Sequence, residues 1–192
     1  MRAFIAIFPP KDLIKEFKDT QNKLIQYKNF LRFADPSTIH ITLRYLGDRV
    51  RGDELTRLIN ELKKRLYDFK SFNIRLNKVQ FGFNEEKWPR ILFISLFRND
   101  KLDRLVSLIN HTVDDLDLAS VEGIKIENNI YHFTLCRKRK DLSRNMVNKI
   151  SSLINDISLE DGFVVKKIDF ISSVLSARGP IYSSIDHIRF TE

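Results

Sequence analysis

Two short stretches of the sequence repeat the same order of residue types. Residues 40–43 read His-Ile-Thr-Leu, and residues 132–135 read His-Phe-Thr-Leu, about half of the 192-residue chain later. On an extended strand, residues two positions apart share a face, so each histidine would share one with its threonine. The apolar residues between them would point into a core. The sequence therefore predicts two strands that each present an imidazole and a hydroxyl to one shared site.

Two imidazoles and two hydroxyls around one point suit displacement at a phosphodiester phosphorus. Histidine titrates near neutral pH, so one ring can take a proton from the attacking hydroxyl or water while the other protonates the leaving oxygen. Threonine hydroxyls can donate to the oxygens of a bound anion, where charge develops in the transition state. We therefore expect His40 and His132 to be catalytic, and Thr42 and Thr134 to bind phosphate.

The repetition is what supports this hypothesis. A lone histidine on a strand is more often structural than catalytic, and threonine favours strands by propensity alone. Structural histidines, however, have no reason to recur with the same neighbours. His111 and His187 lack those neighbours and are expected to be structural or surface residues. The sequence offers no closely spaced set of His, Asp, Glu or Cys ligands, so neither a metal nor another cofactor is expected.

Composition limits the class of protein and its partners. A hydrophobic fraction of 43% with 15 Phe is ample for a packed interior, and we expect a single domain over residues 1–192. The net charge of +8 favours a polyanionic partner such as nucleic acid or a phosphorylated ligand. Cys136 is the only cysteine, which excludes an internal disulfide and favours a reducing compartment. We expect it to fill space beside the second motif.

The apolar start of the chain stops at Pro9 and Pro10, so it is too short for the core of a signal peptide. No apolar run in the sequence approaches membrane-spanning length. We therefore expect a cytoplasmic protein without a membrane partner.

Hydrophobic spacing predicts the same order of elements in each half of the chain. In the first half it predicts a strand, a helix, a short strand, the first motif strand, a helix and a long strand, at residues 3–8, 13–25, 31–33, 39–46, 53–66 and 72–81. In the second half the corresponding elements lie at residues 90–97, 102–113, 124–126, 130–135, 146–154 and 163–175, with a last strand at residues 181–190.

This repetition predicts an α+β fold with two pseudo-symmetric lobes, contributed roughly by residues 1–88 and 89–192. Each lobe would hold an antiparallel-type sheet with helices on its outer face. The two sheets would face each other across a central cleft, with both histidines on its floor. Residues 82–89, which start with Gly and end with Pro, are the predicted boundary between the lobes.

The duplicated His-x-Thr-x pattern resembles the signature of the two-histidine (2H) phosphoesterase superfamily, because its first copy continues as Leu-Arg-Tyr-Leu-Gly at residues 43–47. More narrowly, the chain is similar to the RNA 2',3'-cyclic phosphodiesterases, also called 2'-5' RNA ligases. Residues 1–7 resemble the first strand of that family, and residues 175–182 resemble its C-terminal hairpin. The resemblance therefore runs the length of the chain.

The resemblance implies a bilobal fold and metal-independent hydrolysis of a 2',3'-cyclic phosphate at an RNA end to a 2'-phosphomonoester. It places the catalytic roles on His40, Thr42, His132 and Thr134. We assign His132 as the base that activates water and His40 as the acid that protonates the departing 3'-oxygen. The expected partner is RNA, or a nucleotide, with a 2',3'-cyclic phosphate, and the expected state is a monomer.

Three arginines near the motifs are further candidates for contact with phosphate. Arg137 begins a basic run, residues 137–140, directly after the second motif. The family often has Arg at that position, so we expect Arg137 to bind phosphate. Arg178, in the C-terminal turn, is a second candidate. Arg44 lies four positions after His40 and could point into the cleft.

Three aromatic residues could contact a base. Tyr45 stands where the family commonly has Phe, and a phenol ring can still stack on a base. Phe83 and Trp88 lie at the predicted boundary between the lobes. We expect these two to pack between the lobes rather than to bind a base.

Several alternative functions stay open. Within the same family, the site would equally suit 2'-5' RNA ligation, which is the reverse reaction, or cleavage of 2'-5'-linked oligoadenylate. A non-catalytic RNA-binding module on the same fold would show salt-sensitive binding without turnover. A metal-dependent hydrolase has the least support, because the sequence suggests no ligand set.

Overall fold

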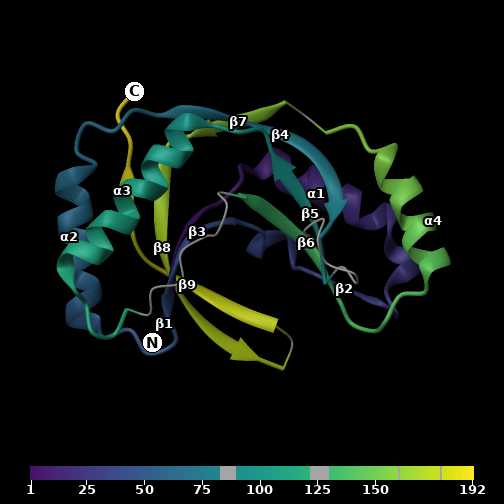
Figure 1. Ribbon diagram of the computed structural model, residues 1–192, viewed down its shortest axis with the longest axis horizontal. Helices are drawn as coiled ribbons and strands as arrows, with labels where there is room; N and C mark the ends of the chain where they lie inside the picture. The colour runs from purple at the N-terminus through teal and green to yellow at the C-terminus, as the bar shows by residue number, and fades with distance from the viewer. Residues whose placement is uncertain (83–89, 122–129, 160, 178) are drawn as a thin grey trace.

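A computed structural model describes residues 1–82, 90–121, 130–159, 161–177 and 179–192 (Figure 1). The fold is α+β, as predicted, with helices and two antiparallel sheets. In chain order the elements are β1 (Arg2–Ile7), α1 (Lys11–Lys23), β2 (Leu31–Phe33), β3 (Ile41–Gly47), α2 (Gly52–Arg65), β4 (Phe72–Phe81), β5 (Ile91–Leu96), α3 (Asp100–Leu116), β6 (His132–Lys138), α4 (Arg144–Asn155), β7 (Gly162–Val165), β8 (Lys167–Ser176) and β9 (Gly179–Arg189).

Each sheet has a buried strand that begins one half of the chain. The first sheet has the order β3-β1-β8-β9 and the second the order β2-β6-β5-β4-β7. β1 and β5 are apolar along almost their whole length and buried on both faces, as expected for central strands. Each of them pairs with one motif strand, β1 with β3 and β5 with β6. The two motif strands therefore hold equivalent places in the two sheets.

The lobes are interlaced, which differs from the expected division near residue 88. β4 comes from the first half of the chain but pairs with β5 in the second sheet, and β8 comes from the second half but pairs with β1 in the first. The short β2 also joins the second sheet, through β6. β4 and β5 follow each other in the chain, and consecutive antiparallel strands usually pair. β4 ends the first half of the chain and β8 and β9 end the second, and each of these strands lies in the sheet of the other half.

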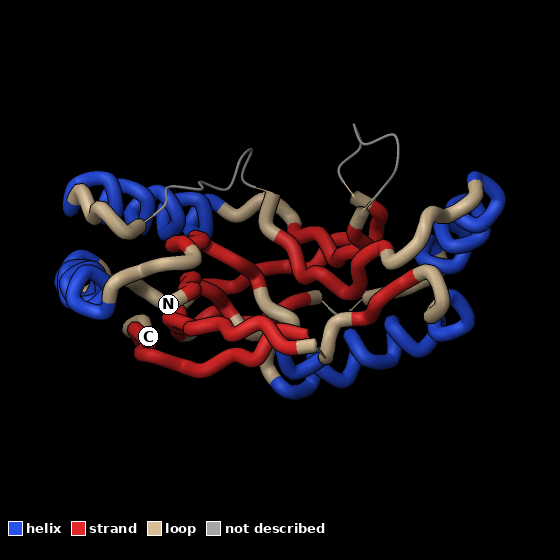
Figure 2. Tube along the Cα trace, turned by 90° about the horizontal axis from the view of Figure 1, so that it is seen from below, coloured by secondary structure: helices blue, strands red, loops and turns tan. Residues whose placement is uncertain are grey.

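The helices are exchanged in the same way. α3 packs on β3 and on α2 beside the first sheet, whereas α1 packs on β6 and α4 on β4 beside the second. The ring of Phe17 on α1 lies 4.9 Å from that of Phe133 on β6, centroid to centroid. Figure 2 shows the helices on the outside of the molecule with the strands between them. Each sheet is therefore covered by one helix from each half of the chain.

Three local predictions have different outcomes. The long strand over residues 72–81 has the predicted break in alternation, because the pairing of β4 with β5 shifts between Leu76 and Val79. The predicted strand over residues 163–175 is two strands, β7 and β8, which belong to different sheets. The predicted strand at residues 124–126 lies outside the described residues. No helix in the described part of the chain is long and apolar enough to cross a membrane.

Candidate active site

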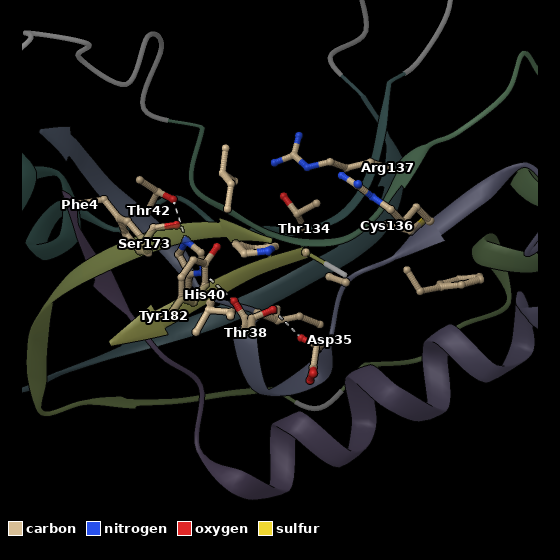
Figure 3. A pocket seen from close by; sticks show the side chains of 18 of the residues that line it. Phe4, Asp35, Thr38, His40, Thr42, Thr134, Cys136, Arg137, Ser173 and Tyr182 are labelled. Atoms are coloured by element: carbon tan, nitrogen blue, oxygen red, sulfur yellow. Dashed lines mark hydrogen bonds between the residues drawn. The ribbon is translucent and has the colours of Figure 1, made fainter. Parts of the chain in front are cut away.

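Both motifs line one pocket between the two sheets. The pocket has a volume of 730 Å³, and His40, Thr42, His132 and Thr134 all contribute to its wall. Figure 3 shows His40 and Thr42 on one side of this space, with Thr134 and Arg137 across from them. Residues 41 and 43 of the first motif, and 133 and 135 of the second, are fully buried in the core. The alternation predicted for each motif is therefore present in the structure.

Each motif strand contains an extra residue at the same place, and β3 has a second one near its end, at residue 46. In β3, Thr42 pairs with Ala6 and Arg44 with Ile5, so Leu43 has no partner of its own. In β6, Thr134 pairs with Phe93 and Cys136 with Leu92, and residue 135 is the extra one. Such a shift, as in a β-bulge, reverses the faces of all residues that follow it. The face that carries histidine and threonine therefore continues at positions 45 and 137.

The ring of His40 is fixed by the backbone. Its Nδ1 lies 2.7 Å from the carbonyl oxygen of Thr38, and its Nε2 lies 3.1 Å from the hydroxyl of Thr42. A carbonyl only accepts hydrogen bonds, so Nδ1 carries the proton in the neutral ring. Nε2 is then the atom that can accept a proton from a group in the pocket or, once protonated, donate one.

His132 is held in the same way. Its Nδ1 lies 3.1 Å from the carbonyl oxygen of Ile130, again two residues earlier in the chain. This bond also keeps the proton on Nδ1 and leaves Nε2 for chemistry. The two motifs thus share a contact that the sequence pattern alone does not reveal.

Burial and nearby positive charge favour the neutral form of both rings. Desolvation lowers the pKa of His40 below its usual range, and the charges of His132 and Arg137 lower it further. Burial also lowers the pKa of His132, with a further contribution from Arg137. A proton on one ring therefore disfavours a proton on the other. The pair suits a reaction in which one imidazole is neutral and the other is charged.

Aromatic rings surround His40, and the motif analysis did not find them. Phe4 stacks on the imidazole with centroids 4.8 Å apart and an angle of 25° between the rings. Phe8 and Tyr182 lie 5.5 Å and 5.4 Å from it. Phe93 lies 5.0 Å from the ring of His132. These contacts come from strands that are distant in sequence, so no local signal could have indicated them.

Comparison with known proteins finds relatives along the whole chain. Residues 7–93 match the model described as LigT like Phosphoesterase. The chain is 27% identical to an RNA 2',3'-cyclic phosphodiesterase of Aquifex aeolicus, over 97% of this chain and 95% of that protein. It is 26% identical to a protein of the same name from Thermotoga maritima, over 99% and 96%. The chain is thus similar to the LigT-like phosphoesterases in sequence.

Solved structures show the same fold. A crystal structure of a Thermus thermophilus protein superposes with a TM-score of 0.81 at 23% identity, covering 99% of this chain and 98% of that one. E. coli LigT in complex with 3'-AMP superposes with a TM-score of 0.73 at 15% identity, covering 100% and 98%. The α+β architecture is therefore the fold of these two proteins.

The register shifts decide which flanking residues face the pocket. Arg137 and Tyr45 line it, and the hydroxyl of Tyr45 donates to Asp48 at 2.5 Å. The guanidinium of Arg2 lies over the ring of Tyr45, 5.4 Å from its centroid. The phosphate contact of Arg137 and base stacking on Tyr45 stay predictions.

Arg44 does not point into the cleft, contrary to the possibility raised by its spacing. The extra residue at position 43 turns Arg44 to the core side of β3, where it is fully buried. Its Nη1 donates to Oδ1 of Asn110 on α3 at 2.8 Å. Strict alternation of faces would have placed it beside the histidine, and the register shift is the reason that it does not.

Some of the remaining predicted residues are described by the structure, and others are not. Cys136 is fully buried and desolvation raises the pKa of its thiol to about 12, which agrees with a space-filling role rather than a nucleophilic one. His111 and His187 are exposed and are not part of the pocket wall. Arg178, Phe83 and Trp88 lie outside the described residues. Among the residues that are described, no three His, Cys, Asp or Glu side chains form a group that could hold a metal ion.

Proposed function

We propose that this protein hydrolyses 2',3'-cyclic phosphate ends of RNA to 2'-phosphomonoesters by acid–base catalysis with two histidines. The observation that carries the proposal is that both histidine–threonine pairs line one pocket, with each Nδ1 bound to a carbonyl oxygen. Each Nε2 is thereby left for proton transfer. The names of the relatives from Aquifex aeolicus and Thermotoga maritima support the same substrate class.

In the proposed reaction His132 acts as the base and His40 as the acid. Nε2 of His132 takes a proton from water as the water oxygen forms a bond to phosphorus. The bond between phosphorus and the 3'-oxygen breaks, and Nε2 of His40 gives its proton to that oxygen. The phosphate remains on the 2'-oxygen. The hydroxyls of Thr42 and Thr134 donate to the non-bridging oxygens, where negative charge is greatest in the transition state.

Hydrolysis of a 2',3'-cyclic mononucleotide, with identification of the product, tests the proposal. We expect the 2'-monophosphate, and turnover that persists in the presence of a chelator. His40→Gln and His132→Gln should each lower kcat by roughly hundredfold or more, the usual size of a general acid–base effect. His111→Gln and His187→Gln are matched controls, because both residues are exposed and lie away from the pocket.

Three outcomes would contradict the proposal. One is unchanged turnover in both pocket variants, and another is a 3'-monophosphate product. Salt-sensitive RNA binding without any turnover by the unaltered protein would instead indicate a non-catalytic RNA-binding module. The controls separate these outcomes from a general effect of removing an imidazole.

The assignment of acid and base has its own test. A phosphodiester with a 4-nitrophenyl leaving group needs little help from an acid, because nitrophenolate is a stable anion. His40→Gln should then lose much less activity on this substrate than on the cyclic nucleotide, while His132→Gln should lose as much on both. The opposite pattern would exchange the two roles.

A further inference from the structure

Two arginines face each other across neighbouring strands at one end of the pocket. Arg32 on the short strand β2 pairs directly with Arg137 on β6. Side chains of directly paired residues lie on the same face of an antiparallel sheet, with Cβ atoms about 4.5–5.5 Å apart. Both arginines are exposed and both line the pocket. The sequence motifs did not single out Arg32.

The alternation of β2 confirms which way these side chains point. Leu31 is buried and pairs with Lys138, and Phe33 pairs with the fully buried Cys136. Leu31 and Cys136 therefore lie on the core side of the two strands, and Lys138 and Phe33 are partly buried beside them. Arg32 and its partner are left on the open face, which is the face that histidine and threonine share in β6.

Like charges placed opposite each other destabilise a sheet. In the described part of the chain, the ion pairs include neither Arg32 nor Arg137, whereas Arg2, also in the pocket wall, is 3.5 Å from Asp48. An anion between the two guanidinium groups would remove the repulsion. Guanidinium forks match phosphate oxygens two at a time, which makes phosphate the chemical class that fits.

Arg137 lies closer to the two histidines than Arg32 does. The charge of Arg137 lowers the pKa of both His40 and His132, so it lies close to the point where the reacting phosphate would bind. Arg32 lies on the edge strand of the sheet, one strand spacing further out, about 4.8 Å. A phosphate held by both arginines would therefore be displaced from the one between the histidines.

We propose that Arg32 and Arg137 form a second phosphate subsite, which binds the phosphodiester that precedes the cyclic phosphate in an RNA chain. This inference rests on the proposed function and adds that the preferred substrate is an oligonucleotide end rather than a mononucleotide. The pocket of 730 Å³ is well within the size range of sites for whole ligands. Its lining also includes the apolar residues Leu175, Pro180 and Ile181, which suit the faces of bases.

The experiment compares two substrates that differ by one nucleoside and the phosphodiester that joins it. A dinucleotide with a 2',3'-cyclic phosphate contains the additional group, and a cyclic mononucleotide does not. Arg32→Gln should lower kcat/KM about tenfold for the dinucleotide, the value of one charged hydrogen-bonded contact, and leave the mononucleotide unchanged. The same variant should also make the slope of log(kcat/KM) against log salt concentration shallower by about one unit for the dinucleotide. For the dinucleotide, kcat/KM of Arg32→Lys should lie between the values of the unaltered protein and of Arg32→Gln, because lysine keeps the charge but lacks the guanidinium fork.

Arg139→Gln is the matched control. It removes the same charge, here from the basic run at residues 137–140, but Arg139 is exposed and is not part of the pocket wall. We expect it to leave both substrates within twofold of the unaltered protein. A loss as large as that of Arg32→Gln would assign the effect to overall charge and overturn the proposal.

Two further outcomes overturn the inference. Equal losses on both substrates would place Arg32 at the reacting phosphate, and no loss on the dinucleotide would remove it from substrate binding. Competition binding with a dinucleotide 2'-monophosphate and a nucleoside 2'-monophosphate does not depend on turnover. If the unaltered protein hydrolyses neither cyclic substrate, the proposed function fails, and weaker binding of only the dinucleotide by Arg32→Gln still decides the subsite.

Discussion

The side-chain amide of Gln21 on α1 donates to the carbonyl oxygen of Leu135 at 2.8 Å, although the two residues are 114 positions apart. Leu135 is the extra residue of β6, and the same oxygen accepts the backbone N–H of Ala34 at 2.9 Å. Gln21 also donates to the carbonyl oxygen of Ala34 at 2.9 Å. The buried amide thus holds the bulge that places Arg137 on the face of Thr134.

Replacing Gln21 should therefore lower stability and disturb the pocket. Gln21→Leu removes one donor from each of the two carbonyl groups, although that of Leu135 keeps the N–H of Ala34, and we expect the free energy of unfolding to fall by about 1–3 kcal/mol. Urea unfolding followed by circular dichroism measures this. Gln26→Leu is the matched control, because Gln26 is exposed and should change stability by less than about 0.5 kcal/mol. Equal effects of the two variants would contradict the role of Gln21.

The pH dependence of kcat/KM follows from the two lowered histidine pKa values. The acidic limb reports protonation of the base, and the basic limb reports loss of the proton from the acid. Burial lowers the pKa of both His40 and His132 from the usual value of about 6.5. Both limbs should therefore move to lower pH, and the maximum should lie below about pH 6.5. A maximum above neutral pH would contradict the buried, neutral pair.

Phe4 provides a way to change that profile. Its ring stacks on His40, so Phe4→Leu should admit water, raise the pKa of that imidazole toward its usual value and shift the limb that it controls to higher pH. Phe72→Leu is a suitable control, since Phe72 is as buried as Phe4 and packs on Phe69 and Phe190 instead. Titration of the His40 ring by NMR in both variants would show whether the stack is the cause.

Stability should also depend on pH through the same pair. The folded pKa values of both histidines lie below the unfolded values, so the unfolded chain binds more protons in mild acid. Their contribution to stability is complete above about pH 6.5 and is lost as the pH falls toward and through the folded pKa values. Between about pH 6.5 and 5, where carboxylates are still ionised, the free energy of unfolding should fall. The His40→Gln/His132→Gln double variant should flatten that fall, and an unchanged slope would assign it to other groups.

Arg44 and Arg137 lie on opposite faces of their motif strands. Replacing Arg44 should affect stability, whereas replacing Arg137 should affect activity. Arg44 is fully buried, and its Nε and Nη2 have no hydrogen-bond partner among the described residues. Replacing a buried charge by an apolar side chain of similar length often stabilises a protein, so Arg44→Met should raise the free energy of unfolding by about 1 kcal/mol and leave kcat/KM within twofold. Arg137→Met should reduce kcat/KM without lowering stability, because it removes the repulsion between Arg137 and Arg32. Loss of activity in Arg44→Met would contradict its placement.

Some features of the fold and site are visible in the sequence because they depend on neighbouring residues. The period of two in residues 40–43 and 132–135 places histidine and threonine on one face wherever the strand ends up. The order of strands and helices likewise follows from local hydrophobic spacing, and the resemblance to the family identifies the two motifs as parts of one site. The alternation of the two motifs agrees with the structure, and so does most of the element order, whereas the predicted strand over residues 163–175 is two strands.

Other features depend on which distant segments pack together. The exchange of β4 and β8 between the sheets cannot be inferred from spacing, because either sheet would bury their apolar faces. The extra residues at positions 43 and 135 turn Arg44 inward and Arg137 outward, and one of them is held by Gln21 from another part of the chain. The pairing of Arg32 with Arg137 arises only when β2 joins the second sheet. The sequence alone determined the chemical groups of the site and their local spacing, whereas tertiary packing decided which charges surround them, since register and strand partners are properties of the assembled core.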